Sequence, residues 1–163
     1  MSNLSKAPVK KVRKALTDAG MNDTVIELAD TARTAEDAAK STGAELGAIV
    51  KSLVFLVGEQ PVMALVSGDH VCKMENLPRA VNLEGEVSKA NAADVKAATG
   101  FSIGGCAPIA HSKDIPIVID VSLKRFDVLY AAAGHHLCVF PVTVTELKKL
   151  TGGIVSYNIA EPI

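Results

Sequence analysis

The chain has 163 residues, of which 48% are hydrophobic and 21% charged, with a formal net charge of −1. This composition is typical of one soluble domain spanning residues 1–163, and it provides no global positive field for binding DNA. No apolar run can span a bilayer, and the N-terminus lacks the apolar segment of a signal peptide. Three widely spaced cysteines argue against a disulfide framework. We therefore expect a cytoplasmic protein without a membrane partner.

The N-terminal part of the chain predicts two helices separated by a short strand at residues 24–29. Residues 7–19 form an amphipathic pattern that ends at Gly20, and Thr34 has the position of an N-cap for a second helix ending at Gly43. The apolar stripe of the first helix consists of Val9, Val12, Leu16 and Ala19. Its basic residues, which form either a solvated face or a local nucleic-acid contact, are Lys6, Lys10, Lys11, Arg13 and Lys14.

The run from Ile49 to Val57 is the most apolar stretch, with seven apolar residues out of nine, and it predicts a strand buried on both faces. Lys51 lies inside it. Strand alternation places Lys51 on the same face as Leu53 and Phe55, so its ammonium emerges among apolar neighbours. Such a charge needs an anion or several acceptors, which a ligand can supply. The alternative is that Lys51 reaches past the sheet edge into water.

The remaining predicted strands are short and bounded by turn residues: 62–67, 86–88, 115–120, 128–133, 137–142 and 154–159. Three further helices are predicted, the first limited by Pro78: 74–81, 91–100 and 143–152. The strand pairs resemble hairpins rather than crossovers. We therefore expect an α/β (α+β) fold with a mixed, mostly antiparallel sheet, curled on itself and flanked by helices.

A second informative stretch is the loop Gly104-Gly105-Cys106-Ala107-Pro108. Two glycines let the backbone take positive φ and approach a ligand closely, and Pro108 stiffens the exit. Consecutive N–H groups in such a loop can stabilise an oxyanion, an effect of about 3 to 4 kcal/mol per donor. The alternative interpretation is an ordinary turn between a helix and a strand.

Ala38, Ala39 and Gly43, together with residues 47–55, 103–111 and 132–135, resemble in order and spacing the YbaK/prolyl-tRNA synthetase-associated editing domain family. The resemblance covers nearly the whole chain. It implies a mixed sheet curled into a distorted barrel with flanking helices. Members hydrolyse mischarged aminoacyl-tRNA, commonly proline tRNA carrying a smaller amino acid.

By this resemblance the chain is expected to be a free-standing deacylase that acts in trans on the acceptor end of mischarged tRNA. A synthetase or an elongation factor is a transient partner, and no cofactor or metal is expected. Lys51, Gly104 and Gly105 match the catalytic elements of the family. The candidate substrate-binding positions are Ser67, Cys106, Ala107, Pro108, His111, Ala132 and Gly134.

The final hairpin departs from the pattern of cysteine-clearing members, which carry a serine and an acid there. This chain has Ala132 and Val139, and residues 128–142 contain no acid. The departure argues against cysteine as the cleared amino acid.

Other functions are compatible with single stretches of the sequence. His70 with Cys72, Cys106 with His111, and the segment 135–138 contain soft ligands for zinc, although none has paired Cys-x-x-Cys spacing. Cys106 with His111 could also serve a thiol hydrolase. A third alternative is a non-catalytic module that binds a tRNA end or a nucleotide.

Overall fold

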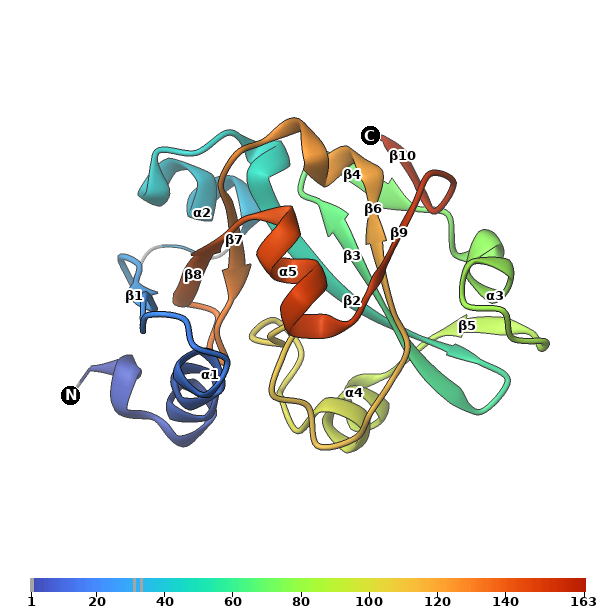
Figure 1. Cartoon of the computed structure of the whole chain (residues 1–163), viewed down its shortest axis with the longest axis horizontal. Coiled ribbons are helices and arrows are strands. Elements are labelled where there is room, and N and C mark those ends of the chain that lie inside the picture. The colour runs from blue at the N-terminus through green and yellow to red at the C-terminus, as the bar shows by residue number, and fades with distance from the viewer. Residues whose placement is uncertain (1, 31, 33) are drawn as a thin grey trace.

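The computed structural model describes residues 2–30, 32 and 34–163, and a long antiparallel hairpin runs through its centre (Figure 1). β2 (Ile49–Val57) and β3 (Gln60–Ser67) pair along their whole length, from Val50 opposite Ser67 to Val57 opposite Gln60. The turn between them is tight and contains Gly58 at φ +61°. This hairpin is the one predicted from the apolar run and the turn residues after it.

In the part of the chain that the structure describes, six further strands join the hairpin in one sheet: β1 (Ile26–Glu27), β5 (Val87–Lys89), β6 (Ile117–Asp120), β7 (Leu129–Ala132), β8 (Cys138–Val142) and β9 (Ile154–Ser156). The order across the sheet is β1-β8-β7-β2-β3-β6-β9, and β5 also pairs with β2. A separate two-stranded sheet pairs β4 (His70–Cys72) with β10 (Ala160–Pro162). Of the predicted strand at 154–159, only Ile154–Ser156 forms a strand, β9, and β10 begins after it at Ala160, in the other sheet.

The sheet is mixed and mostly antiparallel, as predicted, but the expectation that its strands pair only as hairpins is wrong. β7 is parallel to β2, β6 is parallel to β3, and β9 is parallel to β6. Helices and long loops between these strands give the chain enough length to cross over. In the described residues β1 and β9 are not paired with each other, so hydrogen bonding leaves the sheet open.

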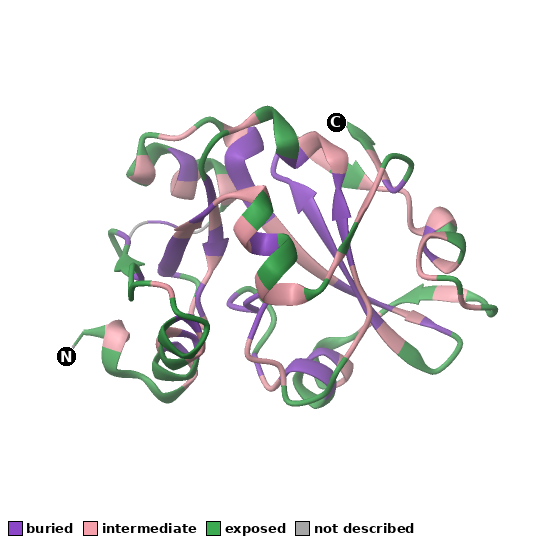
Figure 2. Ribbon diagram, viewed as in Figure 1, coloured by how far each residue is buried: buried purple, intermediate pink, exposed green. Residues whose placement is uncertain are grey.

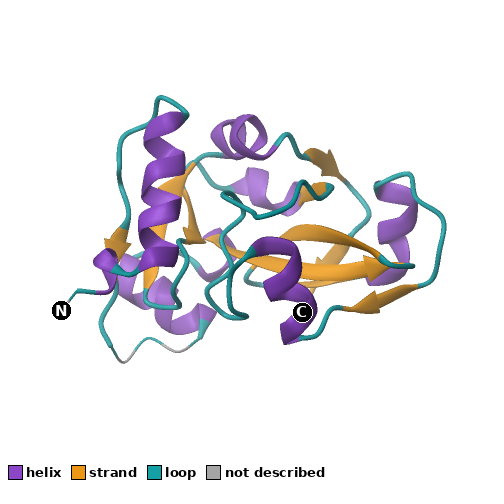
Figure 3. Cartoon of the chain, turned by 90° about the horizontal axis from the view of Figure 1, so that it is seen from below, coloured by secondary structure: helices purple, strands orange, loops and turns teal. Residues whose placement is uncertain are grey.

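Among the described residues, five α-helices pack around the sheet (Figure 3): α1 (Ala7–Asp18), α2 (Ala35–Thr42), α3 (Leu77–Ala80), α4 (Ala92–Thr99) and α5 (Val144–Thr151). The 3-10 turns are η1 (Asn3–Ser5), η2 (Leu46–Ala48), η3 (Met74–Asn76) and η4 (Val121–Arg125). Capping boxes begin α2, α4 and α5 at Thr34, Asn91 and Thr143. Pro78 stands in the first turn of α3 and so begins this short helix rather than breaking it. Among the described helices none is long and apolar enough to cross a membrane.

The core lies on both faces of the hairpin, whose strands are buried along most of their length (Figure 2). One face contributes Val54, Met63 and Leu65 to the larger apolar cluster, and the other contributes residues such as Phe55 and Val62 to a second one. α1 packs against the larger cluster through three fully buried residues of its predicted stripe, whereas Ala19, beyond its end, is exposed.

A network of polar side chains ties the turn after β3 to η4. Arg125 Nη2 donates to Asp69 Oδ1 at 2.8 Å and to Ser67 Oγ at 3.3 Å, and His70 Nδ1 lies 2.7 Å from the same Asp69 oxygen. Gly47 leaves room for this network, since a Cβ at position 47 would lie 2.8 Å from Asp69 Oδ2. The hydrogen bonds from Arg125 lower the pKa of Asp69 to about 2.

We expect Asp69→Asn to lower the free energy of unfolding near neutral pH by about 1 kcal/mol, because the pair with Arg125 is partly screened by solvent. Since the folded-state pKa is depressed from 3.8 to about 2, this contribution is complete above about pH 4 and disappears as the pH falls through 2. Urea unfolding of both proteins from pH 7 to pH 2 measures it. Asp114→Asn, in an exposed loop, is the control. A difference that stays constant with pH would contradict the assignment.

Candidate active site

Two cavities lie side by side where β2 passes beneath the loop that carries Gly104. Their volumes are about 280 and 330 Å³. They share a wall made of Lys51, Ser52 and Leu53 from β2 and of Ile103, Gly104 and Cys106 from the loop. The predicted strand lysine and the predicted glycine loop, about 50 residues apart in the sequence, therefore meet in one place.

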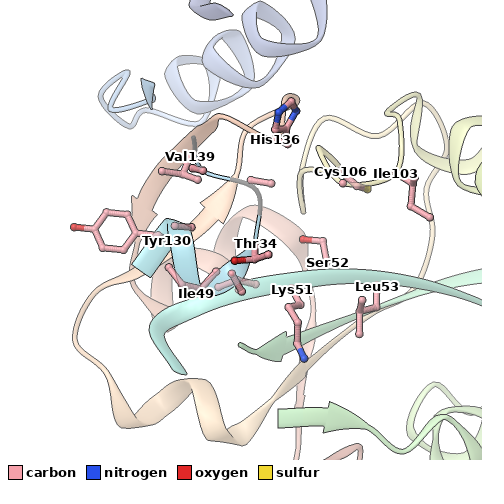
Figure 4. A pocket seen from close by; sticks show the side chains of 16 residues that line it. Thr34, Ile49, Lys51, Ser52, Leu53, Ile103, Cys106, Tyr130, His136 and Val139 are labelled. Carbon is pink, nitrogen blue, oxygen red and sulfur yellow. The ribbon is translucent and has the colours of Figure 1, made fainter. Parts of the chain in front are cut away.

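The first cavity is enclosed by α2, β7 and β8 (Figure 4). Its lining is mainly small and apolar, with Ala35 and Ala38 from α2 and Ala132 and Val139 from the final hairpin. Thr34 and His136 add polar groups at its margin. This cavity is suited to a small side chain of low polarity.

The second cavity extends from the shared wall toward β4 and β5. Phe55, Val71 and Met74 make it apolar, and Lys89 adds a positive charge. Ile103 lines both cavities and is 65% exposed, although it is a large apolar residue. An apolar chamber with a cationic edge is suited to a flat base joined to a phosphate.

Both cavities lie against a gap in the pairing of β2. On the edge opposite β3, β7 pairs with Ile49 and Val50, and β5 pairs with residues 55–57. Between these two ladders no strand pairs with residues 51–53 on that edge in the described part of the chain. The cavities are thus bounded by strand backbone as well as by side chains.

Lys51 lines both cavities, but its side chain leaves β2 on the face opposite Ser52 (Figure 4). Its Nζ donates to the backbone carbonyl of His70 in β4. Burial lowers the pKa of Lys51, and the nearby Asp69 carboxylate opposes that change. The ammonium thus has a protein acceptor, beside the network that holds the Asp69 turn.

The two glycines of the loop meet different structural needs. Gly104 has φ +92°, a conformation that strains any residue with a Cβ. Gly105 lies against the tip of the final hairpin, where a Cβ would be 2.9 Å from His135 Cα. The Gly105 N–H donates to Ser102 O at 3.2 Å, so it is engaged in the turn. In the described residues the N–H groups of Gly104 and Cys106 have no recorded acceptor, which leaves them as the better candidates for donation to a ligand.

Cys106 and His111 do not form a catalytic pair. The Cys106 thiol and His111 Nε2 both point to the Ala107 carbonyl, at 3.6 and 2.7 Å. Burial raises the pKa of Cys106 and lowers that of His111, so the thiol stays protonated and the imidazole neutral near pH 7. Within the residues that the structure describes, no three His, Cys, Asp or Glu side chains are grouped to hold a metal ion.

The other sequence-predicted positions fall in two groups. Cys106 and Ala132 line the cavities, whereas Ser67, Ala107, Pro108, His111 and Gly134 do not. Ser67 is buried beside Ser122 and Arg125, and Gly134 lies against α1, where a Cβ would be 2.6 Å from Pro8 O. Sequence reasoning left Ser52 out, although it follows Lys51 directly and strand alternation turns it to the opposite face.

Residues 29–150 match the family model described as the aminoacyl-tRNA editing domain. YwhH of Bacillus subtilis, an uncharacterized protein, is 30% identical over 88% of this chain and 90% of its own length. EbsC of Enterococcus faecalis, a candidate Cys-tRNA(Pro)/Cys-tRNA(Cys) deacylase, is 30% identical over 73% of each chain.

A crystal structure of a candidate trans-editing enzyme for prolyl tRNA synthetase is 35% identical to this chain. The match covers 96% of this chain and 98% of that one, with a TM-score of 0.89. The fold, the order of its elements and the family model therefore agree with the resemblance seen in the loop and the strand lysine. The chain belongs to the aminoacyl-tRNA editing domain family.

Proposed function

We propose that the protein is an aminoacyl-tRNA deacylase that acts in trans and hydrolyses the aminoacyl ester of proline tRNA charged with a small non-cognate amino acid. The observation that carries this proposal is the meeting of Lys51, Gly104 and Cys106 in the wall between two cavities. Membership of the editing family supports the reaction class, and the likeness to EbsC and to the trans-editing structure supports the type of substrate.

Editing suits the chemistry of the site. A synthetase pocket binds an amino acid that lacks one methylene only about 1 to 3 kcal/mol less tightly than its own substrate. A second site must therefore hydrolyse the mischarged aminoacyl-tRNA. In the reaction, water adds to the ester carbonyl, the bond to the ribose oxygen breaks, and that oxygen takes the proton that water loses. No protein nucleophile is required, because the ester is reactive once it is positioned and its oxyanion is stabilised.

Each part of the site then has a role. The first cavity takes the amino-acid side chain and excludes larger ones, and the second takes the terminal nucleoside. The N–H groups of Gly104 and Cys106 stabilise the oxyanion. Lys51, whose Nζ bonds to β4, supplies positive charge beside the second cavity for the terminal nucleotide. The apolar lining at Ala132 and Val139 favours an aliphatic side chain over one that needs an acidic partner.

A deacylation panel tests the function. Proline tRNA is charged in turn with alanine, cysteine, serine, threonine, 2-aminobutyrate and proline, and release by the protein is compared with spontaneous hydrolysis. Selective release of one small amino acid is expected. Binding of the tRNA without release from any member would instead support a non-catalytic module.

In the same panel Lys51→Ala is expected to reduce deacylation at least about 100-fold, because the charge that positions the terminal nucleotide is lost. Its urea unfolding midpoint should stay close to that of the wild type, since a costly partly buried charge is removed. Lys149→Ala, on the exposed face of α5, is the control and should be fully active. A Lys51→Ala protein that is unfolded without urea would show that the lysine is structural.

Gly105→Ala is expected to slow deacylation about tenfold or more by moving the loop away from the hairpin tip, since even a displacement of about 1 Å is costly to catalysis. Single-turnover kinetics measure the effect. Ser102→Ala, an exposed change in the same loop, is the matched control. Unchanged rates in the Gly105→Ala protein would remove the loop from the mechanism.

A further inference from the structure

In the described chain, the gap in the pairing of β2 leaves the backbone N–H and C=O of Ser52 facing the site. The Gly68 N–H donates to the Ile49 carbonyl, so alternate residues from Ile49 onward bond to β3, and those between them face the other edge. Val54 confirms this alternation, because its carbonyl accepts from Ala90 N–H at 3.3 Å across that edge. The backbone N–H and C=O of Ser52 point to the same edge as those of Val54, but they lie in the gap between the ladders of β7 and β5.

The Ser52 side chain is also without a partner. Its Oγ is buried, and it has no hydrogen-bond partner among the residues that the structure describes. Figure 4 shows this side chain on the face of β2 that looks toward the segment carrying Cys106. A buried hydroxyl left unpaired is costly, and in a binding site the ligand can supply the missing partner.

The cavity walls around Ser52 restrict which group of a ligand can be its hydrogen-bond partner. In the described residues no Asp or Glu lines either cavity, so a cationic group of a ligand must be met by neutral acceptors. The Ser52 carbonyl and hydroxyl oxygens are two such acceptors on one residue. They lie in the shared wall, where an ester spanning both cavities would have its reacting carbon.

We propose that Ser52 is the positioning residue for the α-amino group of the aminoacyl ester. Its main-chain carbonyl and its hydroxyl oxygen accept hydrogen bonds from that group, which sets the ester carbonyl beside the N–H groups of Gly104 and Cys106. This inference rests on the proposed deacylase function and deepens it. It also predicts that esters with a blocked amino group, such as peptidyl-tRNA, are spared, because an acylated nitrogen has fewer N–H donors and more bulk.

A double-mutant cycle between protein and substrate tests the contact. Wild type and Ser52→Ala are compared on alanyl-tRNA and on propionyl-tRNA, which has the same ester without the amino group. We expect Ser52→Ala to slow single-turnover deacylation of alanyl-tRNA about tenfold and that of propionyl-tRNA less than twofold, as for a hydrogen bond to a charged group. Differences in ester reactivity cancel, because each substrate is compared between the two proteins.

Two further measurements separate this role from a structural one. Ser52→Thr keeps the hydroxyl and should retain more of the alanyl-tRNA rate than Ser52→Ala. The urea unfolding midpoint of Ser52→Ala should equal or exceed that of the wild type, because an unpaired buried hydroxyl is removed. A clearly lower midpoint would mean that the hydroxyl has a partner within the protein, and would overturn the inference.

The kinetic outcomes also distinguish the inference from the function on which it rests. If wild type releases alanine but Ser52→Ala slows both substrates equally, the α-amino contact is overturned and the deacylase stands. If wild type releases no amino acid from any charged tRNA, the deacylase function itself is overturned, and the substrate contact with it.

Discussion

The pairing of β2 is the constraint on which the site depends. Along one edge it is complete, because β3 bonds to β2 from end to end. Along the other edge, in the described part of the chain, only the two ends of β2 are paired, one with β7 and the other with β5. A strand that filled this gap would satisfy every peptide group and occupy the space of both cavities. The sheet thus holds β2 rigidly while it leaves a short length of its edge free for a ligand.

Among the residues that the structure describes, no Asp or Glu lines the two cavities beside the gap. Asp69, the carboxylate with the largest effect on the pKa of Lys51, is engaged by Arg125 and His70 at the turn after β3. Lys51 donates to a backbone carbonyl rather than to a carboxylate. The described walls therefore present lysine charges, backbone groups and hydroxyls. Such a lining is complementary to a phosphorylated ligand. An ammonium group of a ligand would bond there to neutral acceptors.

Local sequence signals predicted the ends of the helices well and the pairing of the strands less well. The capping residues Thr34, Asn91 and Thr143 begin the helices that they were expected to begin, and Gly43, Gly100 and Gly152 end them in the left-handed conformation. The expectation that the strands pair only as hairpins failed, because parallel pairing joins strands that are distant in the chain. Periodicity records which face of a strand is buried, but not which strand lies beside it.

The sequence by itself determined that Lys51 stands in a buried strand and that the loop at Gly104 needs glycine, since both follow from local backbone geometry and alternation. Only the tertiary structure decided that these two segments share a wall, that Gly105 touches the final hairpin, and that Ser67 and His111 lie outside the cavities. It also decided that Ser52 faces an unpaired edge. Such facts depend on contacts between segments far apart in the chain, and no local pattern encodes them.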